Sequence, residues 1–308
     1  MTETTRYLPK RPLGRAGFEV TEISLGGAGL GGLYREVSDA DAVATICRAL
    51  ELGINYFETS PFYGQAERRM SLALKELGGK PPGMRLCVKA GTHPDRFGDY
   101  SSASTRWSVE TSLRLMGVET ADLVQIHALD NIDMDSVLGP GGALEELERM
   151  RDQGTVRAIG LGLRGRDFHR RAIASNRFDA ILTHDDYSLI RTTDKELIDE
   201  AVAARVGVLM GRALMMGLLV GGDPMENERL SQLPDAASAR EWWLWAMDRD
   251  IPLQALALQF PLRHPGISSV VVGASSQREV EENVVAMRLD ITGDVWKEVE
   301  SRVAVAAN

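Results

Sequence analysis

The 308-residue chain has little of several features that mark particular classes of protein. Its two cysteines, Cys47 and Cys87, have neither paired nor metal-ligand spacing, which argues against a disulfide scaffold and fits a reducing compartment. The longest apolar runs, such as LQALALQF, are far shorter than the roughly 20 residues that cross a bilayer. The start of the chain, MTETTRYLPKRPLG, lacks the apolar core of a secretion signal. These absences predict a cytoplasmic protein.

Positive charge is also in deficit. Lysine and arginine total 35 against 44 aspartates and glutamates, so the formal net charge is −9 and the isoelectric point is near 5.2. This balance argues against nucleic acid or an anionic membrane as a partner. The apolar fraction of 44% is that of an ordinary globular protein. We therefore expect a small-molecule substrate, and the sequence leaves a monomer and a small homo-oligomer both open.

The order of apolar runs and amphipathic segments predicts a repeating strand–helix pattern. Residues 1–10 are polar and expected to be loose, and residues 11–20 predict a β-hairpin closed around residues 15–17. We expect strands at residues 21–27, 54–58, 85–91, 122–128, 156–163, 179–184, 206–211 and 268–274. We expect helices at residues 39–52 (with Ser38 as N-cap), 66–77, 104–116, 143–153, 166–175, 195–204, 238–249, 252–260, 277–286 and 294–304.

This pattern favours one fold class. Several of the strands are continuous runs of Val, Ile, Leu and Ala, which is typical of a parallel sheet covered by helices. Eight strand–helix units in series favour a closed (β/α)8 TIM barrel over a doubly wound sheet. We expect residues 1–308 to form one such domain, with the hairpin as an N-terminal plug and an extra C-terminal helix. Residues 212–238, which include a stretch rich in Gly, Pro and Met, are expected to form a mobile loop over the barrel mouth.

Four chemically active side chains fall where consecutive predicted strands end. Glu58 ends the second strand, Lys89 lies in the third, His127 lies in the fourth, and Tyr63 follows Glu58 closely. The C-terminal ends of the strands form the mouth of a barrel, so these side chains are expected to meet there. A lysine inside an apolar strand loses its hydration and needs a partner. Each residue alone has an ordinary structural explanation, but their convergence predicts an active site.

The chemistry that this set of residues favours is the interconversion of a carbonyl and an alcohol. A phenol has a pKa near 10, too high for acid–base work at neutral pH without help. An adjacent ammonium, held by a carboxylate, stabilises the phenolate and lowers that pKa. A neutral imidazole can hydrogen-bond the oxygen that gains or loses the proton. A bound nicotinamide would exchange the hydride.

The sequence resembles the aldo-keto reductases over nearly its whole length. The matching blocks, in order, are LGRAGFEVTEISLGGAGLGG, INYFETSPFYG, RLCVKAG, DLVQIHALD, ALEELERMRDQGTVRAIGLGL and SSVVVGASSQREVEENV. Within the family the chain is similar to the bacterial and plant aldose 1-dehydrogenases that act on L-fucose, L-galactose or D-threo-aldoses. The resemblance implies a barrel with NAD(P) across its mouth. It also implies Tyr63 as the acid/base, Lys89 as the neighbour that lowers its pKa, His127 as the substrate-orienting group, and Glu58 at the family's aspartate position.

The resemblance implies cofactor contacts at which this chain departs from the family pattern. Gly162, Leu163 and Arg164 stand where the family usually offers Ser-Asn to the nicotinamide carboxamide. His184 stands at the usual glutamine, three residues before the ring-stacking candidate Tyr187. These exchanges leave open whether the nicotinamide is held in the family's usual way.

On the adenosine side, Ser275 stands where this branch often has Arg, and Glu279 where NADP-preferring relatives often have Arg. Ser276 and Glu279 have the spacing of a capping box, which can receive a phosphate or ribose. Arg278 is then the local cation for a 2′-phosphate, and Arg212 is a candidate for the pyrophosphate. The remaining cofactor candidates are Gly211, Gly273 and Asn283. The glutamate favours NAD over NADP, while the alternative is that Arg278 suffices for NADP.

Two other functions remain open at this point. The first is a barrel that binds the nicotinamide cofactor but turns over poorly, as a sensor or partner subunit, which the departures around the nicotinamide motivate. The second is a metal-dependent enzyme that would use His127, His184, Asp185, Asp186 and Glu58, since imidazole and carboxylate suit several divalent ions. Three adjacent residues at one strand end rarely face one point, so we expect no metal.

Overall fold

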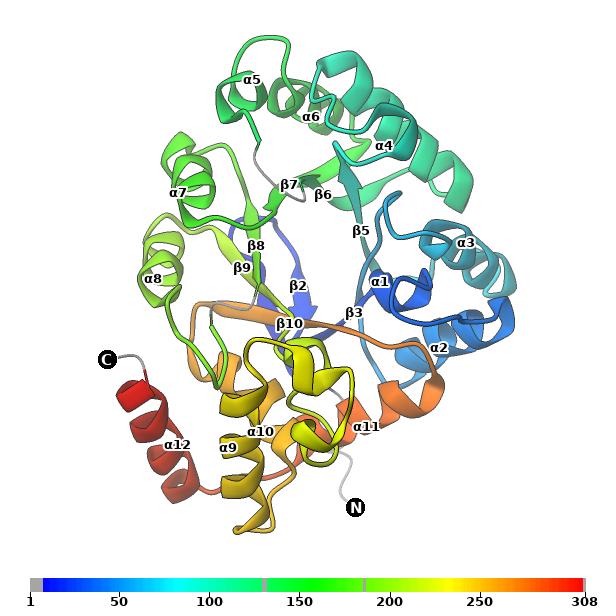
Figure 1. Ribbon diagram of the computed structural model, residues 1–308. Helices are drawn as coiled ribbons and strands as arrows, with labels where there is room; N and C mark the ends of the chain where they lie inside the picture. Colours follow the sequence, from blue (N-terminus) through cyan, green and yellow to red (C-terminus); the bar gives the residue numbers. More distant parts are fainter. Residues whose placement is uncertain (1–7, 129–131, 185–186, 307–308) are drawn as a thin grey trace.

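The computed structural model describes residues 8–128, 132–184 and 187–306, and its centre is a closed barrel of parallel strands (Figure 1). The order around the barrel is β10-β3-β4-β5-β6-β7-β8-β9. The strands are β3 (Ile23–Gly26), β4 (Tyr56–Glu58), β5 (Arg85–Ala90), β6 (Ala121–His127), β7 (Val156–Gly162), β8 (Ala180–His184), β9 (Gly207–Gly211) and β10 (Ile267–Gly273). The expected (β/α)8 barrel is confirmed.

Helices form a ring outside the strands (Figure 1). They are α1 (Gly27–Leu30), α2 (Asp39–Glu51), α3 (Ala66–Glu76), α4 (Ser102–Met116), α5 (Met134–Leu138), α6 (Ala143–Asp152), α7 (Arg166–Ser175), α8 (Lys195–Ala203), α9 (Ala236–Met247), α10 (Leu253–Gln259), α11 (Gln277–Arg288) and α12 (Gly293–Ala306). Ser38 caps α2 as expected, because its hydroxyl accepts from the N–H of Asp41 at 3.1 Å. The short helices α1 and α5 were not expected from the sequence. No helix among the described residues is both long and apolar enough to cross a bilayer.

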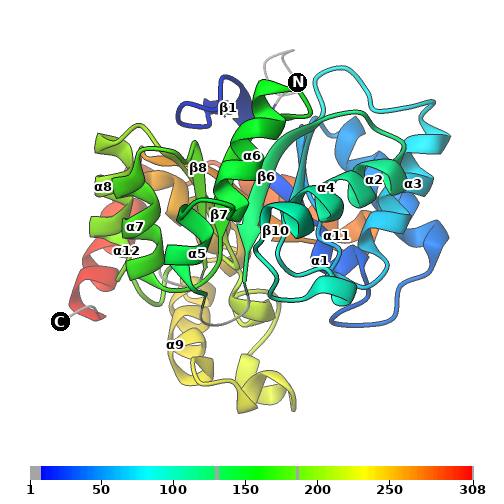
Figure 2. The same ribbon diagram turned by 90° about the horizontal axis from the view of Figure 1, so that it is seen from above.

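The expected N-terminal hairpin consists of β1 (Lys10–Pro12) and β2 (Glu19–Thr21). Leu13 and Val20, on its inner side, are fully buried in a cluster with barrel side chains such as Tyr56 and Leu123. Figure 2 shows the hairpin at one end of the barrel and α9 at the other. The hairpin therefore closes the base, which leaves the opposite end, where the strands terminate, as the mouth.

The segment between β9 and α9 lies at the mouth end and contains the short 3₁₀ turns η3 (Met215–Gly217), η4 (Pro224–Glu226) and η5 (Leu230–Gln232). Leu218, Leu219 and Leu230 are buried and anchor it. The Arg240 Nε donates to the carboxylate of Asp223 at 2.8 Å and ties the segment to α9. That residues 212–238 form a mobile loop over the mouth stays a prediction.

Candidate active site

Three neighbouring strands bring predicted catalytic side chains to one place in the barrel interior. Glu58 is the last residue of β4, Lys89 is the penultimate residue of β5, and His127 is the last residue of β6. Alternate residues of a strand face the same side. Tyr56, Cys87 and Leu123 lie in one buried cluster nearer the base, and the three polar residues follow them at even spacing. The fold therefore places the polar side chains on the mouth side of an apolar layer, and on β6 the buried Gln125 lies between Leu123 and His127.

Tyr63 reaches this cluster from the turn after β4. Its N–H donates to the carbonyl of Ser60 at 3.0 Å, and its carbonyl accepts from the N–H of Ala66, at the start of α3, at 2.9 Å. Gly31, just after α1, lies so close that a Cβ there would overlap the Tyr63 carbonyl. The turn is thus held both by its own hydrogen bonds and by the packing of α1.

The phenol, the ammonium and the carboxylate are in mutual contact. The Lys89 Nζ donates to the Tyr63 Oη at 2.6 Å, and the Tyr63 hydroxyl is 3.3 Å from the Glu58 Oε1, to which it can donate. Lys89 also forms an ion pair with Glu58. The side chains of Lys89 and Glu58 are 0% and 5% exposed, so water screens this pair little. The extra methylene of glutamate is accommodated without loss of the ion pair.

The pKa values in this cluster differ from the sequence-based expectation. Burial raises the pKa of Tyr63 above its ordinary value, and the positive charge of Lys89 offsets only part of that rise. Burial alone would lower the pKa of Lys89, but Glu58 and Tyr63 raise it well above its ordinary value. The expected lowering of the Tyr63 pKa by Lys89 is present, but desolvation outweighs it and the net shift is upward. At neutral pH the site holds a neutral phenol, which is a proton donor, beside a charged lysine.

His127 stands beside the phenol as a neutral imidazole. Its ring centroid is 6.0 Å from that of Tyr63 in an edge-on arrangement. Burial and then Lys89 lower its pKa well below the ordinary value. The Nδ1 of His127 is hydrogen-bonded to the buried hydroxyl of Thr92 at 2.7 Å, and the Tyr100 hydroxyl donates to the His127 carbonyl at 2.9 Å. Thr92 lies two residues after the end of β5, and its side-chain direction could not be inferred from the sequence.

A groove of about 760 Å³ starts at Glu58 and Tyr63, passes the ends of β9 and β10, and extends to the first turns of α11. Glycines end three of the strands beneath it, namely Gly26, Gly211 and Gly273. A Cβ at Gly273 would have only the Gly29 nitrogen, at 3.9 Å, within 4 Å, so any side chain there would enter the groove. The volume is in the usual range for small-molecule sites.

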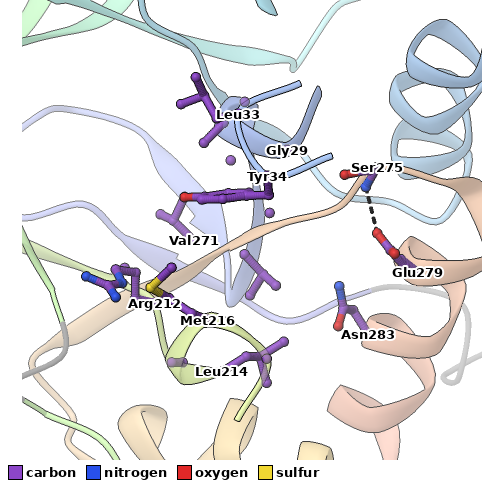
Figure 3. Close-up of a pocket in the computed structure, with 18 of the residues that line it drawn as sticks. Gly29, Leu33, Tyr34, Arg212, Leu214, Met216, Val271, Ser275, Glu279 and Asn283 are labelled. Carbon is purple, nitrogen blue, oxygen red and sulfur yellow. Dashed lines mark hydrogen bonds between the residues drawn. The ribbon is translucent and has the colours of Figure 1, made fainter. Parts of the chain in front are cut away.

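Figure 3 shows the walls of the groove, with Tyr34 lying across from Val271, and Leu214 and Met216 below. Arg212 follows β9 and also lines the groove. Such a wall combines apolar surface for flat rings with a cation suited to a phosphate group.

The segment after β9 is also conformationally unusual. Arg212, Met215 and Met216 have φ values of 60°, 49° and 57°. Non-glycine side chains rarely adopt this left-handed region, and such strain concentrates at ligand sites. The guanidinium of Arg229 donates to the Met216 carbonyl at 3.2 Å and lies in the same wall.

The structure brings one part of the predicted cofactor set into the groove and leaves another part outside it. The predicted residues that line the groove are His184, Gly211, Arg212, Gly273, Ser275, Glu279 and Asn283. The predicted residues that do not are Gly162, Arg164, Tyr187, Ser276 and Arg278.

Packing explains why Tyr187 and Gly162 lie outside the groove. The Tyr187 ring stacks on Phe260 with centroids 5.6 Å apart and packs edge-on against His264, and it is buried among these rings rather than lining the groove. A Cβ at Gly162 would be 2.7 Å from the Gln125 Oε1, so the side-chain amide of Gln125, from β6, fills the space in front of Gly162. The neighbouring Leu163 is 1% exposed and packs in the core.

At the α11 end the expected capping box forms only in part. The Ser276 hydroxyl accepts from the N–H of Glu279 at 3.3 Å, as expected. The Glu279 carboxylate, however, accepts from the N–H of Ser275 at 2.7 Å rather than from the N–H of Ser276. Arg278 has an 82% exposed side chain and pairs with Glu282 on the same helix. The cation that the sequence suggested for a 2′-phosphate therefore does not line the groove. Arg35, which the sequence did not single out, contacts Glu279 instead.

Of the residues in the metal-site hypothesis, His127, His184 and Glu58 are described, and His184 is the one that belongs to the run His184–Asp186. Burial and the charge of Lys89 lower its pKa to about 3, so it is neutral. Asp185 and Asp186 lie outside the described residues. Among residues 8–128, 132–184 and 187–306, no group of three or more His, Cys, Asp or Glu side chains is placed to hold a metal ion.

Several lining residues were missed by sequence reasoning. They are Gly27, Gly29, Leu33, Tyr34, Arg35, Arg229 and Gln254, among others. The Gln254 amide, from α10, donates to the Asn283 Oδ1 at 2.7 Å and fixes that side chain. The glycine-rich block that ends the first barrel strand was a usable signal for Gly27 and Gly29, whereas the direction of loop side chains has no signature in the sequence.

Comparison with known proteins gives consistent matches. The model of the Aldo/keto reductase family matches residues 22–304. L-galactose dehydrogenase of Arabidopsis thaliana is 31% identical over 283 residues, which cover 90% of this chain and 87% of that protein. D-threo-aldose 1-dehydrogenase of a Pseudomonas species is 29% identical over 317 residues, which cover 92% of this chain and 94% of that protein. The solved structure of an aldo-keto reductase from Bacillus halodurans, in its holo form, is 24% identical and shares the fold with a TM-score of 0.81, covering 98% of this chain and 97% of that one.

Proposed function

The chain belongs to the aldo/keto reductase family, and we propose that it interconverts a hydroxyl or lactol and a carbonyl or lactone on a sugar or similar polar substrate, with Tyr63 as the general acid and base. The family resemblance inferred from the motifs is thus confirmed. Membership makes the protein an NAD(P)-dependent oxidoreductase of carbonyl and alcohol groups. The finer assignment is supported above all by the contact of the Tyr63 hydroxyl with the Lys89 ammonium at 2.6 Å.

In the proposed mechanism, Tyr63 donates its proton to the substrate oxygen during carbonyl reduction and takes it back during oxidation. Lys89 stabilises the phenolate that remains after donation, because its ammonium lies within hydrogen-bond distance of that oxygen. Glu58 keeps Lys89 charged and fixed inside the barrel. The burial that raises the pKa of Tyr63 favours the protonated phenol at neutral pH, so oxidation should require more alkaline conditions than reduction.

His127 acts as the orienting group in this proposal. Because it is neutral, one ring nitrogen carries a proton and the other accepts. If the Thr92 hydroxyl donates to Nδ1, the proton is on Nε2, which can then donate to the substrate oxygen. A neutral donor stabilises developing negative charge on that oxygen without competing with Tyr63 for the proton.

The groove fits a nicotinamide dinucleotide. Glycine strand ends leave room for flat rings, and Arg212 and Arg229, which line the groove, supply cations suited to a pyrophosphate. When bound there, the cofactor would supply or accept the hydride. The amide of Asn283 and the carboxylate of Glu279 lie at the far end of the groove. Glu279 puts negative charge where a 2′-phosphate would add more, and we therefore propose NAD over NADP.

A sugar or lactol substrate is supported by the activities named for the two relatives, L-galactose dehydrogenase and D-threo-aldose 1-dehydrogenase. The test is a substrate panel of aldoses, including L-galactose, L-fucose and D-threo-aldoses, beside simple aliphatic and aromatic aldehydes and alcohols. The change in nicotinamide absorbance gives the rates. Turnover of the simple compounds with none of the aldoses would overturn the sugar assignment while leaving the oxidoreductase assignment intact.

The role of Tyr63 is tested with Tyr63→Phe, which removes one oxygen and keeps the ring. We expect kcat/KM to fall by about 10²–10⁴ in both directions, with cofactor affinity measured by fluorescence titration nearly unchanged. Tyr187→Phe is the matched control, because it removes the same atom from a ring that packs outside the groove, and it should keep full activity. Undiminished turnover in Tyr63→Phe would remove the phenol from the mechanism. Cofactor binding without turnover of any substrate by the wild-type protein would instead favour a binding-only subunit.

A further inference from the structure

The wall of the groove contains an exposed aromatic ring that the proposed mechanism does not use. Tyr34 lies in the loop between α1 and α2 and is 65% exposed, and its neighbour Leu33 is 45% exposed. Both side chains line the groove. A large apolar surface left exposed in a concave site marks contact with a ligand. The Tyr34 ring is therefore accessible to a molecule bound in the groove.

The loop that carries Tyr34 is held at both of its ends by one buried side chain. The Arg69 guanidinium, from α3, donates to the Leu30 carbonyl at 2.5 Å and also donates to the Val37 carbonyl. These contacts fix where the loop leaves the fold and where it rejoins it, while residues 32–36 between them are exposed. Tyr34 therefore projects from a short loop whose position is set by α3.

The start of this loop is joined to the turn that carries Tyr63. The N–H of Gln65 donates to the Gly31 carbonyl at 3.2 Å, and a Cβ at Gly31 would overlap the Tyr63 carbonyl. The Tyr34 phenol is close enough to contribute to the raised pKa of Tyr63. In Figure 3 the hydroxyl end of the Tyr34 ring points away from Ser275, which lies at the α11 end. The ring therefore belongs to the catalytic end of the groove.

The ligand that meets this ring follows from what each part of the groove offers. The strand ends Gly211 and Gly273 leave room for the flat nicotinamide ring. Tyr34 instead projects from a loop joined to the Tyr63 turn, so it lies beside the compound that exchanges a proton with Tyr63. A sugar ring has faces of C–H bonds that pack on an aromatic ring, and a tyrosine hydroxyl can also bond to a sugar hydroxyl.

We propose that Tyr34 is a substrate-specificity residue, whose ring packs on the C–H face of a cyclic sugar substrate and holds it beside Tyr63. This inference rests on the proposed function, because it requires an aldose or a similar ring in the groove. A small acyclic aldehyde has no such face and gains little from the aromatic ring. Tyr34 therefore favours cyclic substrates over acyclic ones, by about tenfold for a single aromatic contact.

The variant that tests this is Tyr34→Leu, which removes the aromatic ring and keeps an apolar side chain. We expect kcat/KM for L-galactose, or for the aldose that the wild type turns over best, to fall by about tenfold, mainly through KM. The kcat/KM for propionaldehyde should change by less than about twofold. Tyr34→Phe keeps the ring and should retain most of the affinity for the aldose. The matched control is Phe18→Leu, which removes a ring from the hairpin at the barrel base and should behave as wild type.

Cofactor binding is measured separately, by fluorescence titration with NADH and NADPH, and its Kd in Tyr34→Leu should stay within about twofold of wild type. An equal fall in kcat/KM for both substrates, or an unchanged KM for the aldose, overturns the proposal. A Kd for the dinucleotide that weakens as much as the KM for the aldose places the ring on the cofactor and also overturns it. These results leave the proposed function standing. A wild-type protein that turns over propionaldehyde but no aldose overturns the sugar assignment and this inference together.

Discussion

Exchanging Lys89 for methionine would remove the ammonium that touches Tyr63 while keeping most of the side-chain volume. The two atoms are 2.6 Å apart. At an effective dielectric constant of about 20, unit charges at this separation attract by about 6 kcal/mol, which corresponds to roughly 4–5 pKa units of phenolate stabilisation as an upper bound. The structure already shows burial raising the pKa of Tyr63 against this attraction. Without Lys89, burial and Glu58 would both raise the pKa of Tyr63, and the lowering effect of the ammonium would be lost.

We therefore expect Lys89→Met to lower kcat/KM by at least about 10³, within the range that positioned acid–base groups contribute. The direction of the pH effect is also fixed. Oxidation of an alcohol needs the phenolate, so its rate rises as pH rises toward the pKa of Tyr63. Removing Lys89 raises that pKa further and moves the rising limb to higher pH. Steady-state nicotinamide absorbance from neutral to alkaline pH measures both quantities. A variant with kcat/KM within tenfold of wild type and an unshifted limb would refute the reasoning.

The same substitution leaves Glu58 buried without its partner, so a loss of activity could reflect damage to the fold. Breaking a buried pair from one side costs about 3–5 kcal/mol, whereas removing both charges is often nearly neutral. The double variant Glu58→Gln/Lys89→Met should therefore recover most of the free energy of unfolding, measured with urea, but none of the activity. Recovery of activity with stability would assign Lys89 a structural role only.

Two further predictions concern the neighbours of the site. Gly31→Ala should displace the Tyr63 turn and reduce both stability and kcat, because the new Cβ overlaps the Tyr63 carbonyl, whereas Gly222→Ala, with open space around it, should change neither. His184 has its pKa lowered to about 3, and the unfolded imidazole binds a proton below about pH 6.5. Unfolding therefore takes up a proton between these values, and stability falls as pH drops, by at most about 1.4 kcal/mol per pH unit. His184→Gln should flatten this dependence in urea titrations from pH 7 to pH 4, and an unchanged slope would contradict it.

The fold was predictable from the sequence because its signals are local. Each barrel strand was located to within one or two residues from a continuous apolar run that ends in glycine or a polar residue. The alternation of eight strands with helices favoured a closed barrel over an open sheet. The largest discrepancy, at the first barrel strand, arises because Thr21 pairs with the hairpin strand β1 rather than entering the barrel. The meeting of Glu58, Lys89 and His127 was predictable for a related reason, since barrel topology alone brings consecutive strand ends together.

The rest of the site depends on contacts between residues that are far apart in the sequence, which a local sequence pattern cannot predict. Tyr187 was expected to stack on the nicotinamide, but its direction is fixed by Phe260, which is far away in the sequence. Arg35 was missed because a loop arginine has no signature until its partner on α11 is known. The lowering of the Tyr63 pKa by Lys89 was expected, but the larger opposing effect of desolvation was not, because it depends on the burial of the phenol in the folded structure.

The barrel mouth has to exclude water at one place and leave open volume at another, and a single strand end could not do both. A strong ammonium–phenolate contact needs exclusion of water, whereas a dinucleotide needs open volume beside it. The structure separates the two around the ring of strands. β4, β5 and β6 carry Glu58, Lys89 and His127, all nearly inaccessible to water. On the other side β9, β10 and β3 end in glycines that leave the groove open. Because β3 and β4 are hydrogen-bonded neighbours, the dry half and the open half meet beside Tyr63, where the proposed mechanism brings the proton and the hydride to the same substrate.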